Sequence, residues 1–482
     1  MFDNERTKQA AEIADATGTL LIDGWSQLNR ALASTSFSTG TALHFIDSFD
    51  FDENGQSAEV YLRDVESAYD YITKAKGNVI ALATDNCNTM ISMRNQFAIS
   101  HPEILTYACS DHLVDLILND FVENTMCGAI VSKVKSIQNV FRKHSRIMAG
   151  LKSIKDSLQP LVPNETRWHY SIDMLANYEK NHSSLVACFF LPQLKDPFRK
   201  YQSQMRLLLD AEFNEKVHAV SELLEPFKTA IKQLESDLCA PESVVKIWCD
   251  LRDHIDAQPS SNWRHSSKEI ELEKFDERCS YALSDGHLAA FYLSPNHEPT
   301  LLSTANLAKA RNYARKFIDE DFLVAWQTKD LTCLGVASPS DFVEKNIKKT
   351  LKTFWNHVAA CTNSSNVIMP VVNLVRRLIG IVSTTASQER IFSTYGNICT
   401  KKRNRLRSKV AMQLVFLNRR FNDRPKKVDT VTTTTATTVE EVEREEDEDV
   451  EDLLVVHDES FLILSEEDDD ESDVDEFDDL EF

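Results

Sequence analysis

The sequence lacks an apolar N-terminal signal region and any apolar run of about 18 residues. We therefore expect neither a secreted nor a membrane-spanning chain. Its ten cysteines contain no CxxC pair, which argues against a disulfide framework and indicates a reducing compartment. A structural zinc site needs about four ligands. Because Cys109 and His112 form the only close Cys–His pair, a zinc finger is not expected.

The net charge of −22 is unevenly distributed along the 482 residues. From Asp429 to Phe482 there are 25 acidic residues and one basic residue, Arg444, which gives this segment a charge of −24. The remainder is close to neutral, at about +2. The acidity therefore belongs to a tail and does not exclude nucleic acid as a partner of the folded part.

The first 120 residues alternate between strand-like and helix-like segments. Residues 18–27 form an apolar strand pattern that leads into an acidic turn, and 31–51 resemble a hairpin around Gly40. Residues 57–75 have helical periodicity, and 78–86 are a short apolar run typical of a strand buried on both faces. Residues 105–118 add a strand that leads into a helix. This alternation of strands and helices predicts an α/β fold with a mixed sheet and packed helices.

From about 120 to 350 the pattern is helical, and from 353 to 425 it is mixed. Between 133 and 152 an apolar stripe is accompanied by a basic face, which is either a solvated surface or a phosphate-contacting one. Beyond Asp429 a Thr-rich linker and the acidic tail contain too few apolar residues to fold alone. The stripe contains Val134, Ile137, Phe141, Met148 and Leu151, and the basic face contains Lys133, Lys135, Arg142, Lys143, Arg146 and Lys152.

Three carboxylates stand out by their positions. Asp23 and Asp85 each follow an apolar strand pattern, and Glu389 stands upstream of a dense basic run. Side chains at the carboxyl ends of strands converge on ligands at one edge of a sheet. Taken singly, each Asp also fits an ordinary turn or helix cap.

In their order along the chain, these motifs resemble the hAT transposase superfamily. The segments are LLIDGWS (20–26), ATDNCNTM (83–90), CSDH (109–112), ETRWHYSIDML (165–175) and SQERIFSTYGNICTKKRNRL (387–406), and LLEPFK (223–228) is a weaker one. The last long segment is similar to the family's C-terminal dimerisation region. The resemblance extends from about residue 18 to 422.

The resemblance implies a ribonuclease-H-like fold interrupted by a large all-α insertion. It assigns 1–120 and 351–425 to the two parts of that domain, 121–350 to the insertion and 426–482 to the linker and disordered tail. Family members usually carry a BED-type zinc finger before the first catalytic strand. Here that strand begins by about Gly18, so we expect the module to be missing.

The resemblance also implies that Asp23, Asp85 and Glu389 form a DDE triad. Hard cations such as Mg²⁺ or Mn²⁺ are held by carboxylates, and two such ions can activate the attacking group and stabilise the leaving oxygen. His112 is then expected beside the scissile phosphate as a hydrogen-bond donor.

Several residues are expected to contact DNA. Arg167 and Trp168 match the family's RW pair, and a Trp there could stack on an extruded base. A core Trp beside a surface Arg fits these two residues equally well. The basic run is interpreted as a phosphate-facing surface, with a nuclear-import signal as its rival; both place the chain in the nucleus. Its residues are Lys401, Lys402, Arg403, Arg405, Arg407 and Lys409, and Arg390, next to Glu389, is a further expected DNA contact.

Two functions compete on this evidence. The first is a DDE transposase that cleaves and joins DNA with Mg²⁺ or Mn²⁺. The second is a non-enzymatic, transposase-derived nuclear protein that acts through dimerisation and partners. Residues 409–421 form a helical pattern whose apolar face must be buried, either in the chain's own core or against a partner, and the hAT resemblance implies a partner. The face contains Val410, Leu414, Phe416 and Leu417.

The tail offers a further partner. DLLVV (452–456) and FLILSEEDDDE (461–471) place short β-prone runs beside acids and resemble SUMO-interacting motifs, which add a strand to the partner's sheet. Ser465 precedes an acidic run typical of an acid-directed kinase site. A solubilising tail with incidental Leu and Val is the alternative.

Overall fold

The computed structural model describes residues 1–27, 30–51, 55–162, 169–236, 239–328, 331, 350–361, 365–400 and 406–422. The chain divides into two compact units, Met1–Arg424 and Pro425–Phe482, and every described residue lies in the first.

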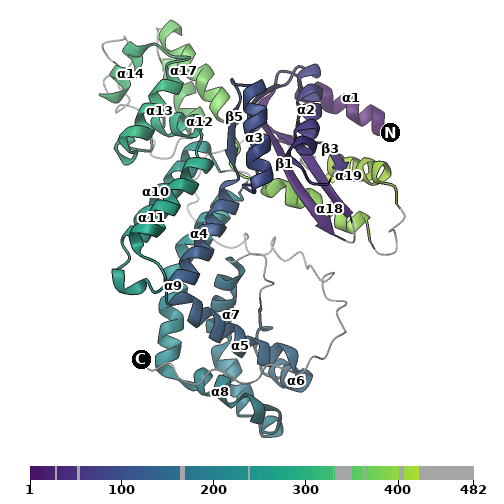
Figure 1. Cartoon of the computed structure of the whole chain (residues 1–482), viewed down its shortest axis with the longest axis vertical. Coiled ribbons are helices and arrows are strands. Elements are labelled where there is room, and N and C mark those ends of the chain that lie inside the picture. Colours follow the sequence, from purple (N-terminus) through teal and green to yellow (C-terminus); the bar gives the residue numbers. More distant parts are fainter. Residues whose placement is uncertain are drawn as a thin grey trace, which may run out of the picture. The chain divides into compact units, whose positions relative to one another are not determined.

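A five-stranded mixed sheet is built from the first 108 residues, in the order β3-β2-β1-β4-β5 (Figure 1). β1 pairs antiparallel with β2 and parallel with β4. β3 pairs antiparallel with β2, and β5 pairs parallel with β4. The prediction of a mixed α/β sheet is confirmed. The strands are β1 (Thr17–Gln27), β2 (Arg30–Ser38), β3 (Leu43–Asp50), β4 (Asn78–Thr84) and β5 (Leu105–Ala108).

The predicted hairpin joins β2 to β3 through a turn that contains Gly40. Gly40 has φ +77°, a left-handed conformation that strains residues with a Cβ atom. The predicted helix 57–75 is α2 (Ala58–Lys74), and Ser57 caps it by accepting a hydrogen bond from the Val60 amide.

Two helices of this region are not predicted by the sequence. α1 (Phe2–Ile13) buries mainly polar side chains, Glu5 and Gln9, and therefore has no apolar stripe. α3 (Asn88–Ser100) has a buried face of Met90, Met93 and Phe97 that is interrupted by the buried Arg94. Neither helix therefore has the regular apolar spacing that predicts an amphipathic helix.

Side chains of β1 alternate between the two faces of the sheet. Leu20 and Ile22 pack into a core with α2 and α3, whereas Leu21 faces a second core built with helices from later in the chain. A third core joins β2 and β3 to the last two helices. Helices therefore cover both faces of the sheet.

α1 lies along β3, which is the edge strand of the sheet. The Gln9 side chain donates a hydrogen bond to the Phe45 carbonyl at 2.9 Å, and Arg6 donates to the carbonyl of Ile46. The helix thus occupies backbone acceptors that an edge strand would otherwise present to another chain.

The predicted helical region is confirmed in the described residues up to 328. No helix in the described part of the chain is long and apolar enough to cross a membrane. The α-helices between Ser110 and Gln327 are α4 (Ser110–Asn124), α5 (Cys127–Lys143), α6 (Ser145–Lys152), α7 (His169–Phe189), α8 (Gln202–Leu209), α9 (Ala211–Leu234), α10 (Pro241–Asp256), α11 (Lys268–Ala282), α12 (Asp285–Tyr292), α13 (Thr304–Ala314) and α14 (Glu320–Gln327). Short 3₁₀ turns are η1 (Pro192–Leu194), η2 (Pro197–Tyr201), η3 (Ser260–Asn262) and η4 (Pro299–Leu301).

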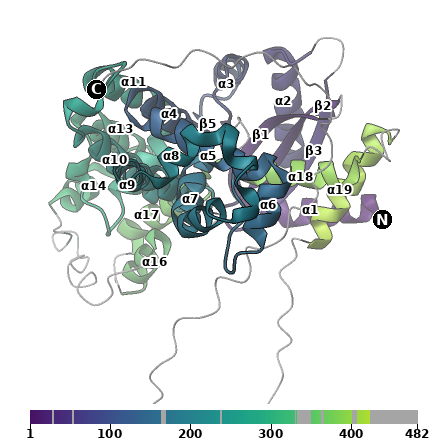
Figure 2. The same ribbon diagram turned by 90° about the horizontal axis from the view of Figure 1, so that it is seen from below.

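The last described part is helical, and the expectation of mixed character for 353–425 is wrong there. Residues 350–361, 365–400 and 406–422 contain α16 (Leu351–Cys361), α17 (Ser365–Leu378), α18 (Ala386–Ile398) and α19 (Ser408–Asn422), and no strand. Figure 2 shows α1, α18 and α19 together beside the sheet. Apolar side chains of α18 and α19 are buried against β2 and β3. This burial explains why the sequence of these two helices is apolar enough to resemble strands.

Candidate active site

Asp23 and Asp85 lie next to each other on neighbouring parallel strands. Ile22 of β1 pairs with Thr84, the last residue of β4, so the residue after each is an Asp at the same edge of the sheet. Neighbouring strands are about 4.8 Å apart. Two residues far apart in the sequence therefore lie side by side on paired strands, an arrangement that suits the triad implied by the resemblance.

One detail of the expected strand end is wrong. Asp23 does not end β1, because the strand continues to Gln27 and Asp23 pairs with Ser34 of β2. It is β4 that stops, at Thr84. Asp23 therefore lies where the long β1–β2 ribbon extends beyond its parallel neighbour.

A buried glutamine holds the beginning of α18, which carries the third predicted carboxylate, against the same strands. Gln388 accepts a hydrogen bond from the Ser34 hydroxyl at 2.9 Å and donates one to the Leu21 carbonyl at 3.2 Å. Ser34 is the residue that pairs with Asp23. Glu389 follows Gln388 in the first turn of α18. The beginning of α18 is thus held against the part of β1 and β2 that carries Asp23.

His112 contacts Asp85 directly. Its Nε2 lies 3.1 Å from the Asp85 Oδ1, and both side chains are partly exposed. His112 comes from the first turn of α4, which begins directly after β5. The structure therefore brings His112 to the candidate site.

Arg94, which the sequence does not single out, holds the loop that carries Asp85. Its guanidinium donates to the Asp85 carbonyl at 2.6 Å, to the Asn86 side chain at 2.7 Å and to the Thr84 hydroxyl at 2.5 Å. Burial lowers the pKa of Arg94, and the Asp85 charge acts in the opposite direction. The only signal in the sequence is an Arg inside the apolar row of α3.

Tyr61 of α2 is a second residue beside the candidate site that the sequence does not single out. A Cβ atom on Gly24 would lie 2.6 Å from the Tyr61 hydroxyl, so this hydroxyl lies directly beside the residue that follows Asp23. Burial raises the pKa of Tyr61, and Cys87, Asp23 and Asp85 raise it further. Tyr61 is therefore a neutral hydroxyl at neutral pH beside the acidic edge.

Cys109 joins the His112 region to α18. Its thiol lies 2.6 Å from the Asp111 Oδ1, as a donor, and accepts hydrogen bonds from the amide and hydroxyl of Thr385 at 3.0 and 3.2 Å. Burial, followed by the Asp111 charge, raises the pKa of this thiol. Thr385 is the residue that precedes α18. Cys109 is therefore a buried packing residue that also helps to position the start of α18.

The segment between α17 and α18 is fixed by buried side chains from several elements. Thr19 of β1 donates to the Gly380 carbonyl at 2.8 Å, and Tyr107 of β5 donates to the Val382 carbonyl at 2.7 Å. His287 of α12 pairs through Nε2 with the Ser383 hydroxyl at 2.8 Å. The position of α18 is therefore determined by the sheet and by the helical region together.

A metal ion at this edge would need a set of hard oxygen ligands. Carboxylate oxygens suit Mg²⁺ and Mn²⁺. Within the described ranges, however, no group of three or more His, Cys, Asp or Glu side chains is positioned to hold one ion. The donor chemistry fits the ion, and the arrangement brings together a pair of carboxylates but not a complete ligand set.

The predicted DNA-contacting residues are only partly described. Arg390 and Arg407 are exposed, on α18 and just before α19. Lys409, in the first turn of α19, is exposed as well. The remaining predicted contacts, and both SUMO-like motifs, lie outside the described residues; the contacts are Arg167, Trp168, Lys401, Lys402, Arg403 and Arg405.

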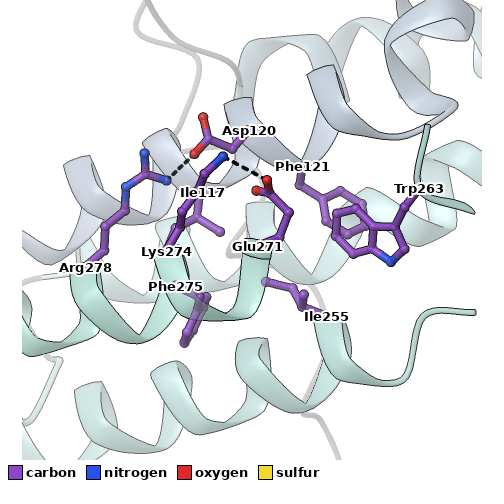
Figure 3. Close-up of a pocket in the computed structure, with 9 residues that line it drawn as sticks. All are labelled: Ile117, Asp120, Phe121, Ile255, Trp263, Glu271, Lys274, Phe275 and Arg278. Carbon is purple, nitrogen blue, oxygen red and sulfur yellow. Dashed lines mark hydrogen bonds and ion pairs between the residues drawn. The ribbon is translucent and has the colours of Figure 1, made fainter. Parts of the chain in front are cut away.

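A pocket in the helical region is separate from these residues (Figure 3). Its space of about 10 Å³ suits about one water molecule. Two ion pairs border it, Arg278–Asp120 at 2.7 Å and Lys274–Glu271 at 2.8 Å. The pocket is a packing feature between α4 and α11, not a substrate site.

Comparison with known families gives two matches. Residues 3–137 match a domain of unknown function, DUF659, and residues 365–421 match the hAT family C-terminal dimerisation region. The two matches together support an hAT-family transposase-like protein. No curated protein matches significantly. The hAT match covers α17, α18 and α19 and supports formation of a homodimer.

The hAT dimerisation region leaves one face of α19 exposed. Ala411, Val415 and Phe416 are buried against the chain's own core. Val410, Leu414 and Phe421 are 40 to 48% exposed, and Leu417 is half-buried. These four residues, here called the α19 stripe, recur at helical spacing and form one apolar face. The predicted apolar face is thus correct for Val410, Leu414 and Leu417, whereas Phe416 belongs to the core.

Proposed function

We propose that this chain is a nucleic-acid-binding dimer whose Asp23, Asp85 and Glu389 form a DDE-type site for metal-dependent DNA cleavage and strand transfer. The observation that carries the proposal is the adjacency of Asp23 and Asp85 at one sheet edge, with Gln388 bonded to Ser34 beside them. The strand order β3-β2-β1-β4-β5 supports a ribonuclease-H-like core.

In this proposal the three carboxylates hold Mg²⁺ or Mn²⁺. A bound ion of this kind activates an attacking water or hydroxyl and stabilises the leaving oxygen. Substrate binding would complete the ligand set, since Asp23 and Asp85 already lie side by side. Arg94 keeps the Asp85 loop in place, and His112 orients the Asp85 carboxylate and lies where it can donate to a phosphate.

The basic residues around α18 and α19 supply the proposed DNA contacts. Arg390 is exposed one residue after Glu389, and Arg407 and Lys409 are exposed at the start of α19. Positive charge next to a carboxylate site offsets the repulsion between the acids and phosphate. Action on DNA also places the protein in the nucleus in this proposal.

The test is Mn²⁺-dependent nicking of a labelled hairpin or duplex by purified full-length protein. The wild type is expected to cut, and Asp85→Asn to lose at least about a hundredfold in rate. Asp70→Asn is the matched control, because Asp70 is an exposed carboxylate paired with Lys74 on α2. A wild type that dimerises but does not cut refutes the enzymatic proposal.

A second candidate is a non-enzymatic nuclear protein that acts through dimerisation and partner binding. The observation that favours it is the Asp85–His112 contact, together with the incomplete ligand set among the described residues. In that case Asp85→Asn leaves partner capture unchanged, whereas disruption of the α19 stripe removes it. The SUMO-like motifs at 452–471 are one proposed source of partners, which titration of the tail with SUMO would test.

A further inference from the structure

Positive charge is concentrated on one part of the helical region. Residues 133–206 contain 13 Lys and Arg and five Asp and Glu, which gives a charge of +8. Residues 207–330 contain 14 Lys and Arg and 22 Asp and Glu, which gives a charge of −8. The two charges cancel in the total, so composition alone conceals the segregation.

The basic residues belong to helices that pack into one block. Phe141 of α5 lies 5.7 Å from Phe198 of η2, measured between ring centroids. Gln204 of α8 donates to Ser136 of α5 at 3.2 Å. A Cβ on Gly150 of α6 would meet Leu194 of η1 at 2.5 Å. Figure 1 shows α5, α6 and α8 next to one another.

The outer surface of this block is here called the basic lobe. Segments 133–155 and 195–206 contain eleven Lys and Arg and a single acid, Asp196. Ten of the eleven are exposed, and Lys135 is half-buried. Within the described residues only Arg199 among them has a carboxylate partner, Asp196, at 3.3 Å. The eleven are Lys133, Lys135, Arg142, Lys143, Arg146, Lys152, Lys155, Lys195, Arg199, Lys200 and Arg206.

Basic residues of the adjoining acidic helices are arranged differently. Arg252, Lys268 and Arg315 each pair with a carboxylate, at Asp276, Asp256 and Glu320. Apart from Arg199–Asp196, the described residues of the lobe therefore carry positive charge without ion pairs such as those beyond residue 207. Such a surface attracts a polyanion.

We propose that the basic lobe binds the phosphate backbone of duplex nucleic acid, independently of sequence, as a second contact surface apart from the carboxylate edge. A membrane surface fits less well, because an interfacial helix needs an exposed apolar face. The apolar faces of α5 and α6, with Val134, Phe141 and Ile147, are buried. The inference deepens the proposed function, since it rests on nucleic acid as the partner.

The test compares full-length wild type with the triple variant Lys143→Ala, Lys152→Ala, Lys195→Ala. These three lysines are exposed and lie around the contact between α6 and η1. The control replaces the same number of exposed basic residues on the acidic side: Lys232→Ala, Arg264→Ala, Lys309→Ala. Binding to a fluorescent duplex of arbitrary sequence is followed by anisotropy over a range of salt concentrations.

The triple variant is expected to bind about tenfold more weakly, and its salt slope should fall by about one for each phosphate-binding lysine replaced. The control is expected to match the wild type. Equal weakening in both triples, or unchanged binding by the lobe triple, overturns the inference, as does lobe-dependent binding to phosphatidylserine vesicles but not to DNA. Asp85→Asn separates the two proposals: it removes cleavage and leaves lobe binding intact, so failure of cleavage alone refutes only the enzymatic site.

Discussion

Arg420 and Glu12 join the last described helix of the chain to the first. The Arg420 guanidinium donates to both carboxylate oxygens of Glu12, and its Nη2 lies 2.8 Å from the Glu12 Oε1. A second carboxylate, Glu5, lies 3.6 Å from the same nitrogen. Phe2 packs edge-on against Phe416, with 5.0 Å between the ring centroids. α1 therefore holds the inner face of the hAT helix α19 and leaves the α19 stripe outward.

Removal of the Arg420 side chain should loosen α19. Arg420 is only 13% exposed, and Arg420→Ala removes both of its bonds to Glu12 and its contact with the nearly buried Glu5, which keeps its pair with Lys8; the change should cost about 1–3 kcal/mol of unfolding free energy. Hydrogen exchange of α19 amides should rise more than that of the sheet. Lys409→Ala, an exposed change on the same helix, is the control. Equal protection of α19 in both variants would contradict the role of Arg420.

The α19 stripe should form the dimer contact. Leu414→Asp places a charge in the middle of the exposed apolar face and should shift the protein to monomer at micromolar concentration. Light scattering after size-exclusion chromatography measures the mass. Asn418→Asp adds the same charge at a polar position of α19 and should remain dimeric. A monomeric wild type at micromolar concentration would rule out this contact.

The sequence predicts the sheet well because β-strand patterns and the hairpin turn depend on local residues. It groups Asp23, Asp85 and Glu389 only through family resemblance, because the strand order that places Asp23 beside Asp85 cannot be read from local patterns. The roles of Arg94 and Gln388 cannot be predicted from the sequence, because the hydrogen-bond partners of a buried polar side chain are known only once the fold is known. The bond from Arg94 to the Thr84 hydroxyl spans ten residues, and the bond from Gln388 to Ser34 spans 354.

Gly24 and Tyr61 should show a paired effect. Gly24→Ala would place a methyl group 2.6 Å from the Tyr61 hydroxyl, which should cost about 1–3 kcal/mol of unfolding free energy. Tyr61→Phe removes the clashing oxygen, so the double variant should recover most of that loss. Chemical denaturation of the four proteins gives the coupling energy. Strictly additive costs would mean that the cost of Gly24→Ala does not arise from the Tyr61 hydroxyl.

His287 should make the protein sensitive to acid. Its side chain is fully buried, and burial lowers its pKa to about 3. Its Nδ1 lies 2.9 Å from the Ser284 hydroxyl, and Tyr107 packs edge-on against the ring at 4.7 Å. No charged group is among these contacts. Protonation would therefore place an uncompensated charge between α12 and the segment that leads to α18.

The sign follows from the two protonation states. The unfolded chain binds the proton below a pKa of about 6.5, whereas the folded protein does not until about pH 3. Folding stability is therefore full above pH 6.5 and falls as the pH drops toward 3. Between pH 7.5 and 5.5 the wild type should lose about 1.4 kcal/mol more than His287→Gln, which cannot titrate at this position.

Urea denaturation at the two pH values measures this difference, with each variant compared against itself so that its lower starting stability does not matter. His265→Gln is the matched control, because His265 lies at the surface of the helical region; it should lose as much stability as the wild type. Equal losses in the wild type and His287→Gln would show that His287 gains its proton without opening the contact with Ser383. A smaller loss in His287→Gln alone would locate an acid-sensitive contact between the helical region and the segment that positions Glu389.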